Sequence, residues 1–128
     1  MAVAIQASGG IFSSTGDGIG YSAGAGGTIT QQTNKATGVT LNTICGQITM
    51  NAASLAAATI VSFVLTNSKI ASGDVLVLNH VSGGTPGSYT LNARAAAGSA
   101  TIDVRNNTAG ALAEAVAIGF VVVKGVTA

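Results

Sequence analysis

Apolar and polar side chains alternate strictly along two neighbouring segments, residues 89–94 and residues 100–105. Strict alternation places the two sets of side chains on opposite faces of a β-strand, so each segment predicts a half-buried strand. The linker between them, residues 95–99, is short enough for a hairpin loop. We therefore expect the two strands to pair antiparallel, with their polar side chains together on one solvated face.

The other long strand patterns differ in how many of their faces are apolar. Residues 59–66 place alternate apolar side chains on one face, whereas residues 74–81 and 116–123 are apolar on both faces. A strand that is apolar on both faces is typical of the centre of a sheet or of a surface that a partner covers. We expect the last two segments to be central strands or to be covered by a partner.

The connecting segments predict short strands and turns. Shorter strands are expected at residues 38–41 and 44–50. The Ala-rich residues 51–57, which begin with an Asn of the type that caps helices, and residues 109–113 each predict one helical turn. Neither segment is long enough to form a stable independent helix, so helices serve only as connections in the predicted fold.

These patterns together predict an all-β fold, an antiparallel β-sandwich or barrel-like domain of about seven or eight strands. A jelly roll and an immunoglobulin-like sandwich both fit the pattern. The apolar positions of the strands supply the predicted core. Its members are Val61, Phe63, Leu65, Leu91, Ile102, Val104, Ile118 and Phe120.

The first 27 residues have a different character and predict an extended N-terminal arm, followed by the β-domain at residues 28–128. Gly, Ser and Ala dominate the arm, and its hydrophobic residues follow no sustained period. Such a segment is flexible alone, but spaced hydrophobic side chains let it become ordered on a partner surface. The arm residues that we expect to bind a partner are Ile5, Ile11, Phe12, Ile19 and Tyr21.

The composition is that of a folded chain with little charge. The 128 residues fit one domain, 48% of them are hydrophobic, and the mean hydropathy is +0.56. Charged residues make up 7%, and a net charge of +1 provides no basic stripe for nucleic acid. No apolar run is long enough to span a bilayer, so a membrane partner is not expected. Near-neutrality gives little protection from self-association, which indicates a part of an assembly.

One short motif is similar to a catalytic one. Residues 20–24 (GYSAG) match the G-x-S-x-G nucleophile elbow, and Asp74 and His80 follow in the chain order of an α/β-hydrolase triad. The elbow needs a strand that leads into a helix, and neither element is predicted around Ser22. Residues 18–23 also fit a dinucleotide-binding loop, but the strand, the helix and the acidic residue that this loop needs are missing. We predict that the chain is not an enzyme and binds no cofactor.

The remaining reactive residue types are isolated in the sequence. His80 is the only histidine and Cys45 the only cysteine, so neither has the companions that a metal site needs. We interpret His80 as a hydrogen-bonded structural residue and Cys45 as a small packing residue. Residues 106–108 (NNT) spell a glycosylation sequon, which we interpret as a polar turn. The sequence therefore predicts no catalytic, cofactor-binding or metal-binding residue.

Five runs of the chain resemble small structural proteins of tailed bacteriophages, and the resemblance extends over about residues 26–124. The runs are residues 26–42 (GGTITQQTNKATGVTLN), 45–53 (CGQITMNAA), 61–68 (VSFVLTNS), 77–84 (VLNHVSGG) and 104–106 (VRN). In such phages the similar domain occurs as a head decoration (cement) protein, and also as a module of fibre-like proteins. The resemblance implies a non-enzymatic β-domain, and it supplies no catalytic residue to carry over.

For this chain the resemblance implies a virion protein on the capsid surface, made in the cytoplasm of the host bacterium. Its partners would be the major capsid protein and further copies of itself, as a homotrimer, with no nucleic acid, membrane or cofactor. The alternative is a tail or fibre module that binds a host receptor or a glycan. The plain format of an arm and one domain in 128 residues, without a long repetitive shaft, favours decoration.

Overall fold

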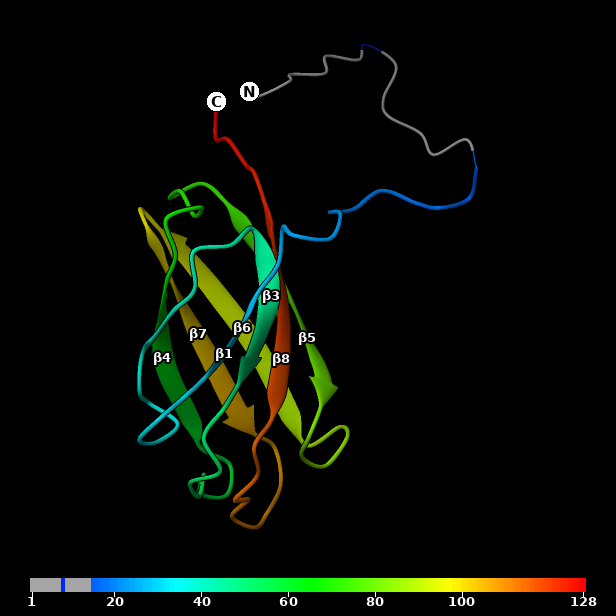
Figure 1. Cartoon of the computed structure of the whole chain (residues 1–128). Helices are drawn as coiled ribbons and strands as arrows, with labels where there is room; N and C mark the ends of the chain where they lie inside the picture. Colours follow the sequence, from blue (N-terminus) through cyan, green and yellow to red (C-terminus); the bar gives the residue numbers. More distant parts are fainter. Residues whose placement is uncertain (1–7, 9–14) are drawn as a thin grey trace.

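A computed structural model of the chain describes residue 8 and residues 15–128, which fold into two packed four-stranded β-sheets (Figure 1). Within these described residues no helix forms, and the predicted all-β sandwich is confirmed. In chain order the strands are β1 (Thr28–Thr30), β2 (Val39–Thr40), β3 (Cys45–Thr49), β4 (Ile60–Thr66), β5 (Val75–Ser82), β6 (Tyr89–Ala96), β7 (Ser99–Asn106) and β8 (Ala117–Val123).

The strand order is β1-β3-β8-β5 in one sheet and β2-β4-β7-β6 in the other. The sheet that contains β3 and β8 lies in front in Figure 1. Most neighbouring strands pair antiparallel, as predicted, but β1 runs parallel to β3 and β2 runs parallel to β4. Both sheets are therefore mixed, since the edge strands β1 and β2 are parallel to the strands beside them.

The predicted hairpin is formed by β6 and β7. Leu91 lies opposite Val104 in this pair, and the polar side chains that alternate with the apolar ones, such as Asn92 and Asp103, lie on the outer face. The strands are longer than predicted, since Ala96 pairs with Ser99 and leaves a loop of only Ala97 and Gly98. Gly98 has a φ of +76°, in the left-handed region that favours glycine, so this residue type permits the tight turn.

The core lies between the two sheets and matches the predicted apolar positions closely. Six of the eight predicted core residues are buried, whereas Val61 and Leu91 are half-buried and pack against the buried cluster. Ile48, Met50 and Val122 join the same cluster. The side chains therefore follow the predicted alternation on β4, β7 and β8.

The two strands that are apolar on both faces have different positions. β8 lies between β3 and β5, so the prediction of a central strand is confirmed for it. β5 is an edge strand that pairs with β8 alone, so the central alternative is excluded for β5 and the partner-covered alternative stays a prediction. Its outward apolar side chains are exposed in the single chain, and this exposure defines the surface described below.

The two predicted helical turns are wrong, because both segments are extended. Leu55 and Leu112 form an isolated antiparallel bridge, with N–H···O distances of 2.8 and 3.0 Å. Asn51 does not cap a helix. Its Oδ1 accepts a hydrogen bond from the N–H of Ala53 at 2.8 Å, which holds a turn after β3. The Ala-rich composition favoured helix, but pairing with a distant segment prevails.

Buried polar side chains fix the loops at the ends of the sandwich. Lys35 is 4% exposed, and its ammonium group donates to the carbonyl oxygens of Asn51 and Glu114 at 2.6 and 2.5 Å. Burial lowers the pKa of Lys35, and the nearby Glu114 carboxylate opposes that shift. Asn106 is fully buried, and its amide donates to three loop carbonyl groups, those of Leu55, Ala56 and Gly110.

Candidate docking face

Five exposed valines lie together on the outer face of β5 and β8, and we call them the valine stripe. Val75 lies opposite Val123, and Val77 lies opposite Val121, because β5 and β8 pair in that register. Val81 lies further along β5. The side chains of the five residues are 38–57% exposed. They point outward because the intervening residues of each strand, such as Val122, point into the core.

Near the start of β8, two side chains of β5 lie over Gly119. A Cβ atom at this position would lie 2.5 Å from Oδ1 of Asn79 and 2.9 Å from Cγ2 of Val81. Both distances are too short for real contacts, so only glycine lets these β5 side chains rest on the backbone of β8. The apolar surface therefore extends across two strands at Val75, Val77, Val121 and Val123, and the amide of Asn79 lies between it and Val81.

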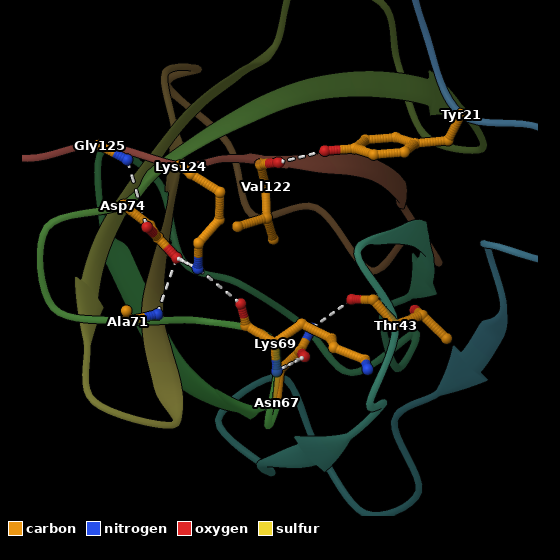
Figure 2. Close-up of polar contacts among 9 residues, drawn as sticks. All are labelled: Tyr21, Thr43, Asn67, Lys69, Ala71, Asp74, Val122, Lys124 and Gly125. Atoms are coloured by element: carbon orange, nitrogen blue, oxygen red, sulfur yellow. Dashed lines mark hydrogen bonds and ion pairs between the residues drawn. The ribbon is translucent and has the colours of Figure 1, made fainter. Parts of the chain in front are cut away.

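The base of the N-terminal arm is attached beside the stripe. The hydroxyl of Tyr21 donates a hydrogen bond of 2.9 Å to the carbonyl oxygen of Val122 (Figure 2). Val122 lies just beyond the β3–β8 ladder, which begins where Cys45 pairs with Val121. Tyr21 thus binds the part of β8 that extends past the first residue of β3.

The arm and β8 enclose a hollow of about 320 Å³. Its lining is mostly apolar and open to solvent on one side. It is formed by Ile19, Gly20, Tyr21, Val121, Val123 and Lys124. Ile19 is 75% exposed and Tyr21 is 49% exposed, so both side chains are available to a partner that fills the hollow.

The charged groups at the rim of the face neutralise each other. Lys124 Nζ lies 2.5 Å from Oδ2 of Asp74, and it also donates to the carbonyl oxygen of Lys69 at 3.0 Å (Figure 2). Asp74 Oδ2 also accepts the N–H of Ala71 at 2.7 Å. The hydrogen bond from Lys124, followed by that from Ala71, holds the pKa of Asp74 below its usual value. The valine stripe therefore carries no net charge at its rim.

The outer face of the other sheet is polar, as predicted. Asp103 accepts hydrogen bonds from Ser62 at 2.6 Å, Arg94 at 3.0 Å and Asn92 at 3.3 Å. The Ser62 hydroxyl is the largest cause that lowers the pKa of this carboxyl group. Ile60 and Val64 also lie on this face and are 53% and 44% exposed, but they lie opposite the polar residues Arg105 and Thr101 of β7. Only one face of the sandwich is therefore a broad apolar surface.

The predicted arm residues are placed only in part. Ile5, Ile11 and Phe12 lie outside the described residues. Ile19 and Tyr21 lie beside the valine stripe, where both line the hollow. Sequence reasoning did not name the stripe itself, although the two segments that are apolar on both faces were its signal.

The residues of the hydrolase-like motif do not form one site. Ser22 is exposed in a turn, where its carbonyl oxygen accepts the N–H of Ala25 at 3.2 Å, and no helix follows within the described chain. Asp74 pairs with Lys124. His80 lies six residues further along the extended strand, about 20 Å from Asp74. Asp74 is therefore too far away to orient the imidazole.

His80 has structural partners of its own. Its Nε2 is in hydrogen-bond contact with the carbonyl oxygen of Gly83, and its ring meets that of Tyr89 edge-on, with centroids 5.9 Å apart. Among residues 15–128, no group of three or more His, Cys, Asp or Glu side chains is arranged to hold a metal ion. The described part of the chain also contains no helix long and apolar enough to cross a membrane.

Glu114 organises the loop next to His80. Its carboxylate accepts hydrogen bonds from the N–H and hydroxyl of Thr85, at 2.9 and 2.6 Å, and from the hydroxyl of Tyr89 at 2.6 Å. These bonds, that of the Thr85 side chain first, lower the pKa of Glu114. Burial and then the neighbouring carboxylate raise the pKa of Tyr89. The hydrogen bonds between Thr85 and Glu114 therefore hold the loop after β5 against the segment before β8.

We expect acid to destabilise the fold through these carboxylates. Asp74, Asp103 and Glu114 each have a lowered pKa in the folded chain. Their contribution is complete above the unfolded-state pKa values of about 4, and it is lost as pH falls through the lower folded-state values. Urea unfolding at pH 7 and pH 3 should show this loss, and Glu114→Gln should reduce it. An equal pH dependence in the parent and the variant would contradict the role of Glu114.

Comparisons with protein-family models, with curated proteins and with solved structures find no match to this chain. The fold and the docking face are therefore interpreted from the residues of the chain itself. The most informative feature is the contrast between the polar outer face around Asp103 and the apolar outer face of β5 and β8.

Proposed function

We propose that the chain is a non-enzymatic structural protein of a tailed-phage virion, a decoration (cement) protein that binds the major capsid protein lattice and stabilises the head. The observation that carries the proposal is the valine stripe beside the base of the arm. Monomeric soluble proteins rarely expose contiguous apolar surfaces, and such surfaces commonly mark interaction sites. The resemblance of residues 26–124 to phage structural proteins supports the virion as the assembly concerned.

The arm is the part that we propose to bind the capsid. Residues 15–20 are exposed, and the dark blue segment in Figure 1 leads away from the sandwich. Tyr21 fixes the base of this segment on β8. We propose that Ile5, Ile11 and Phe12 enter apolar grooves on the capsid protein, where the glycines between them allow close approach of the backbone.

Self-association strengthens this attachment. We propose a homotrimer on the capsid surface, assembled after synthesis in the bacterial cytoplasm and without cofactor, nucleic acid or membrane. In a trimer, binding of one arm raises the effective concentration of the other two arms at their sites, so weak individual contacts combine into stable attachment. The low charge of the chain, 7% of residues, opposes this association little.

Deletion of residues 2–26 tests the role of the arm. The shortened protein should keep the far-ultraviolet circular dichroism of a β-domain but lose binding to capsids assembled without the parent protein. In the full chain, Phe12→Asp should weaken binding strongly, because it places a charge at an apolar contact. Ser13→Asp adds the same charge one residue further on and should bind as the parent does.

Three outcomes would count against this role. If the shortened protein binds capsids with parental affinity, attachment lies in the sandwich and the arm is dispensable. If the shortened protein does not fold, residues 2–26 belong to the domain. Equal binding by Phe12→Asp and Ser13→Asp would remove the apolar arm contact from the proposal.

The alternative function is that of a tail or fibre module that binds a host receptor or a glycan. One observation favours it, a shallow hollow of about 170 Å³ on the polar outer face. Amide, carboxylate and guanidinium groups meet an apolar side chain there. The lining residues are Ile60, Thr90, Asn92, Asp103 and Arg105. Copy number separates the two functions, since hundreds of copies per virion indicate decoration and a few dozen or fewer indicate a tail or fibre.

A further inference from the structure

The valine stripe combines a projection and a recess on one face. Val75 and Val77 project from β5, the edge strand, and are 57% and 55% exposed. The recess is the hollow between the arm and β8, where Ile19 and Tyr21 face Val121 and Val123. The projection and the recess lie on neighbouring strands, so they are side by side.

Charge favours a second copy of the chain as the occupant of this face. The stripe contains no ionisable side chain, and the rim charges of Asp74 and Lys124 pair with each other. With a net charge of +1, two copies repel each other only weakly when these faces meet. The opposite face could not associate in the same way, because contact there would desolvate the ion pair of Arg94 and Asp103.

We infer that the valine stripe is the surface on which copies of this chain associate, with Val75 and Val77 of one copy seated in the arm-lined hollow of the next. The hollow, about 320 Å³, is lined mostly by apolar side chains, with Lys124 also in its lining, and has room for valine side chains. Tyr21, attached to Val122, forms one wall of it. The base of the arm is thus part of the interface.

The projection and the recess lie on one face, so one copy can share both with a single partner in a two-fold dimer, or share them with two different neighbours in a heterologous contact. We infer the heterologous contact, in keeping with the proposed homotrimer. Heterologous contacts form closed rings when the rotation between copies closes, and a three-fold ring is the smallest form above a dimer. The inference rests on the self-association in the proposed function and identifies its surface. In this arrangement the N-terminal part of the arm is not used between copies and is available to bind the capsid protein.

Sedimentation equilibrium with matched charge variants tests the surface. The full-length parent should be a trimer at tens of micromolar. Val77→Asp should raise the dissociation constant about 100-fold or more, because a carboxylate would be buried without a partner. Val64→Asp introduces the same charge at an exposed strand valine of the other sheet and should leave the trimer intact. Thermal unfolding should show both variants folded.

Cross-linking tests the seating of the valines in the hollow. Two preparations carry Cys45→Ala, one with Ile19→Cys and the other, with a different affinity tag, with Val75→Cys. A short bis-maleimide should link the two tagged chains after mixing. Val64→Cys in place of Val75→Cys should link far less.

The outcomes separate this inference from the proposed function. A monomeric parent, or a trimer that Val77→Asp and Val64→Asp affect equally, overturns the stripe as the self-association surface. Equal linking of the Val75→Cys and Val64→Cys preparations overturns the seating in the hollow. Capsid binding by the Phe12→Asp variant is measured separately, so failure of capsid attachment leaves the self-association result standing.

Discussion

Replacement of Phe120 by Ala should lower the free energy of unfolding by about 3–5 kcal/mol. Phe120 lies on β8 in the middle of its sheet and is 2% exposed. Its ring reaches the backbone of β3, where a Cβ atom at Gly46 would lie 3.2 Å from Cε1 of Phe120. Truncation would leave a cavity that the surrounding strands can close only in part. Urea unfolding monitored by circular dichroism measures the loss.

Val121→Ala is the matched control for this prediction. Val121 is the next residue on the same strand, but its side chain points outward and is 38% exposed. The change should alter the free energy of unfolding by less than about 0.5 kcal/mol, when it is measured at concentrations too low for association. Similar losses for the two variants would show that β8 does not present Phe120 to the core.

The long strands could be predicted because alternation is a local signal. The pairing of Leu91 with Val104 follows from two adjacent segments and the short loop between them. In contrast, the parallel pairing of β1 with β3 and of β2 with β4 depends on β1 and β2, which have only three and two residues. Such short segments carry almost no periodic pattern, so their partners and directions could not be predicted from the sequence.

The sequence left two alternatives open for β5. Residues 74–81 are apolar on both faces, and two situations give that pattern: a central strand and an edge strand that meets a partner. The sequence does not separate the two, because the difference depends on which strands of the same chain lie beside β5. β8 satisfies the first situation, and we propose the second for β5.

The candidate site could be predicted only as residue types. Tyr21 was expected to bind a partner because it is an isolated aromatic residue in a Gly-rich arm. Its hydrogen bond to Val122 joins residues that are 101 positions apart, so no local pattern indicates it. The hollow likewise depends on the arm meeting β8. A β-sandwich alone does not define a function, so this surface is what indicates an assembly protein.

The sequence pattern around Asn106 did not reveal that this residue is buried and holds two loops. As part of the NNT run it was interpreted as a polar turn, yet it is fully buried at the end of β7. Its Oδ1 accepts the N–H and hydroxyl of Thr108 at 2.9 and 2.8 Å. Its Nδ2 donates to the carbonyl groups of Leu55, Ala56 and Gly110 at 3.1, 3.2 and 2.8 Å. One side chain therefore holds both extended segments that were expected to be helical turns.

Asn106→Asp should therefore lower the free energy of unfolding at pH 7 by at least about 3 kcal/mol, because three carbonyl groups lose their donor and face a carboxylate. The mismatch favours the protonated acid, so the folded-state pKa of the new carboxyl group should exceed its unfolded-state value, and the deficit relative to the parent should shrink as pH falls. Asn107→Asp adds the same charge at an exposed neighbour, where it removes only a 2.8 Å hydrogen bond to Thr90, and should cost less than about 1 kcal/mol. Urea unfolding of both variants at pH 7 and pH 4 measures the difference, and equal deficits at pH 7 would mean that Asn106 does not hold the two segments.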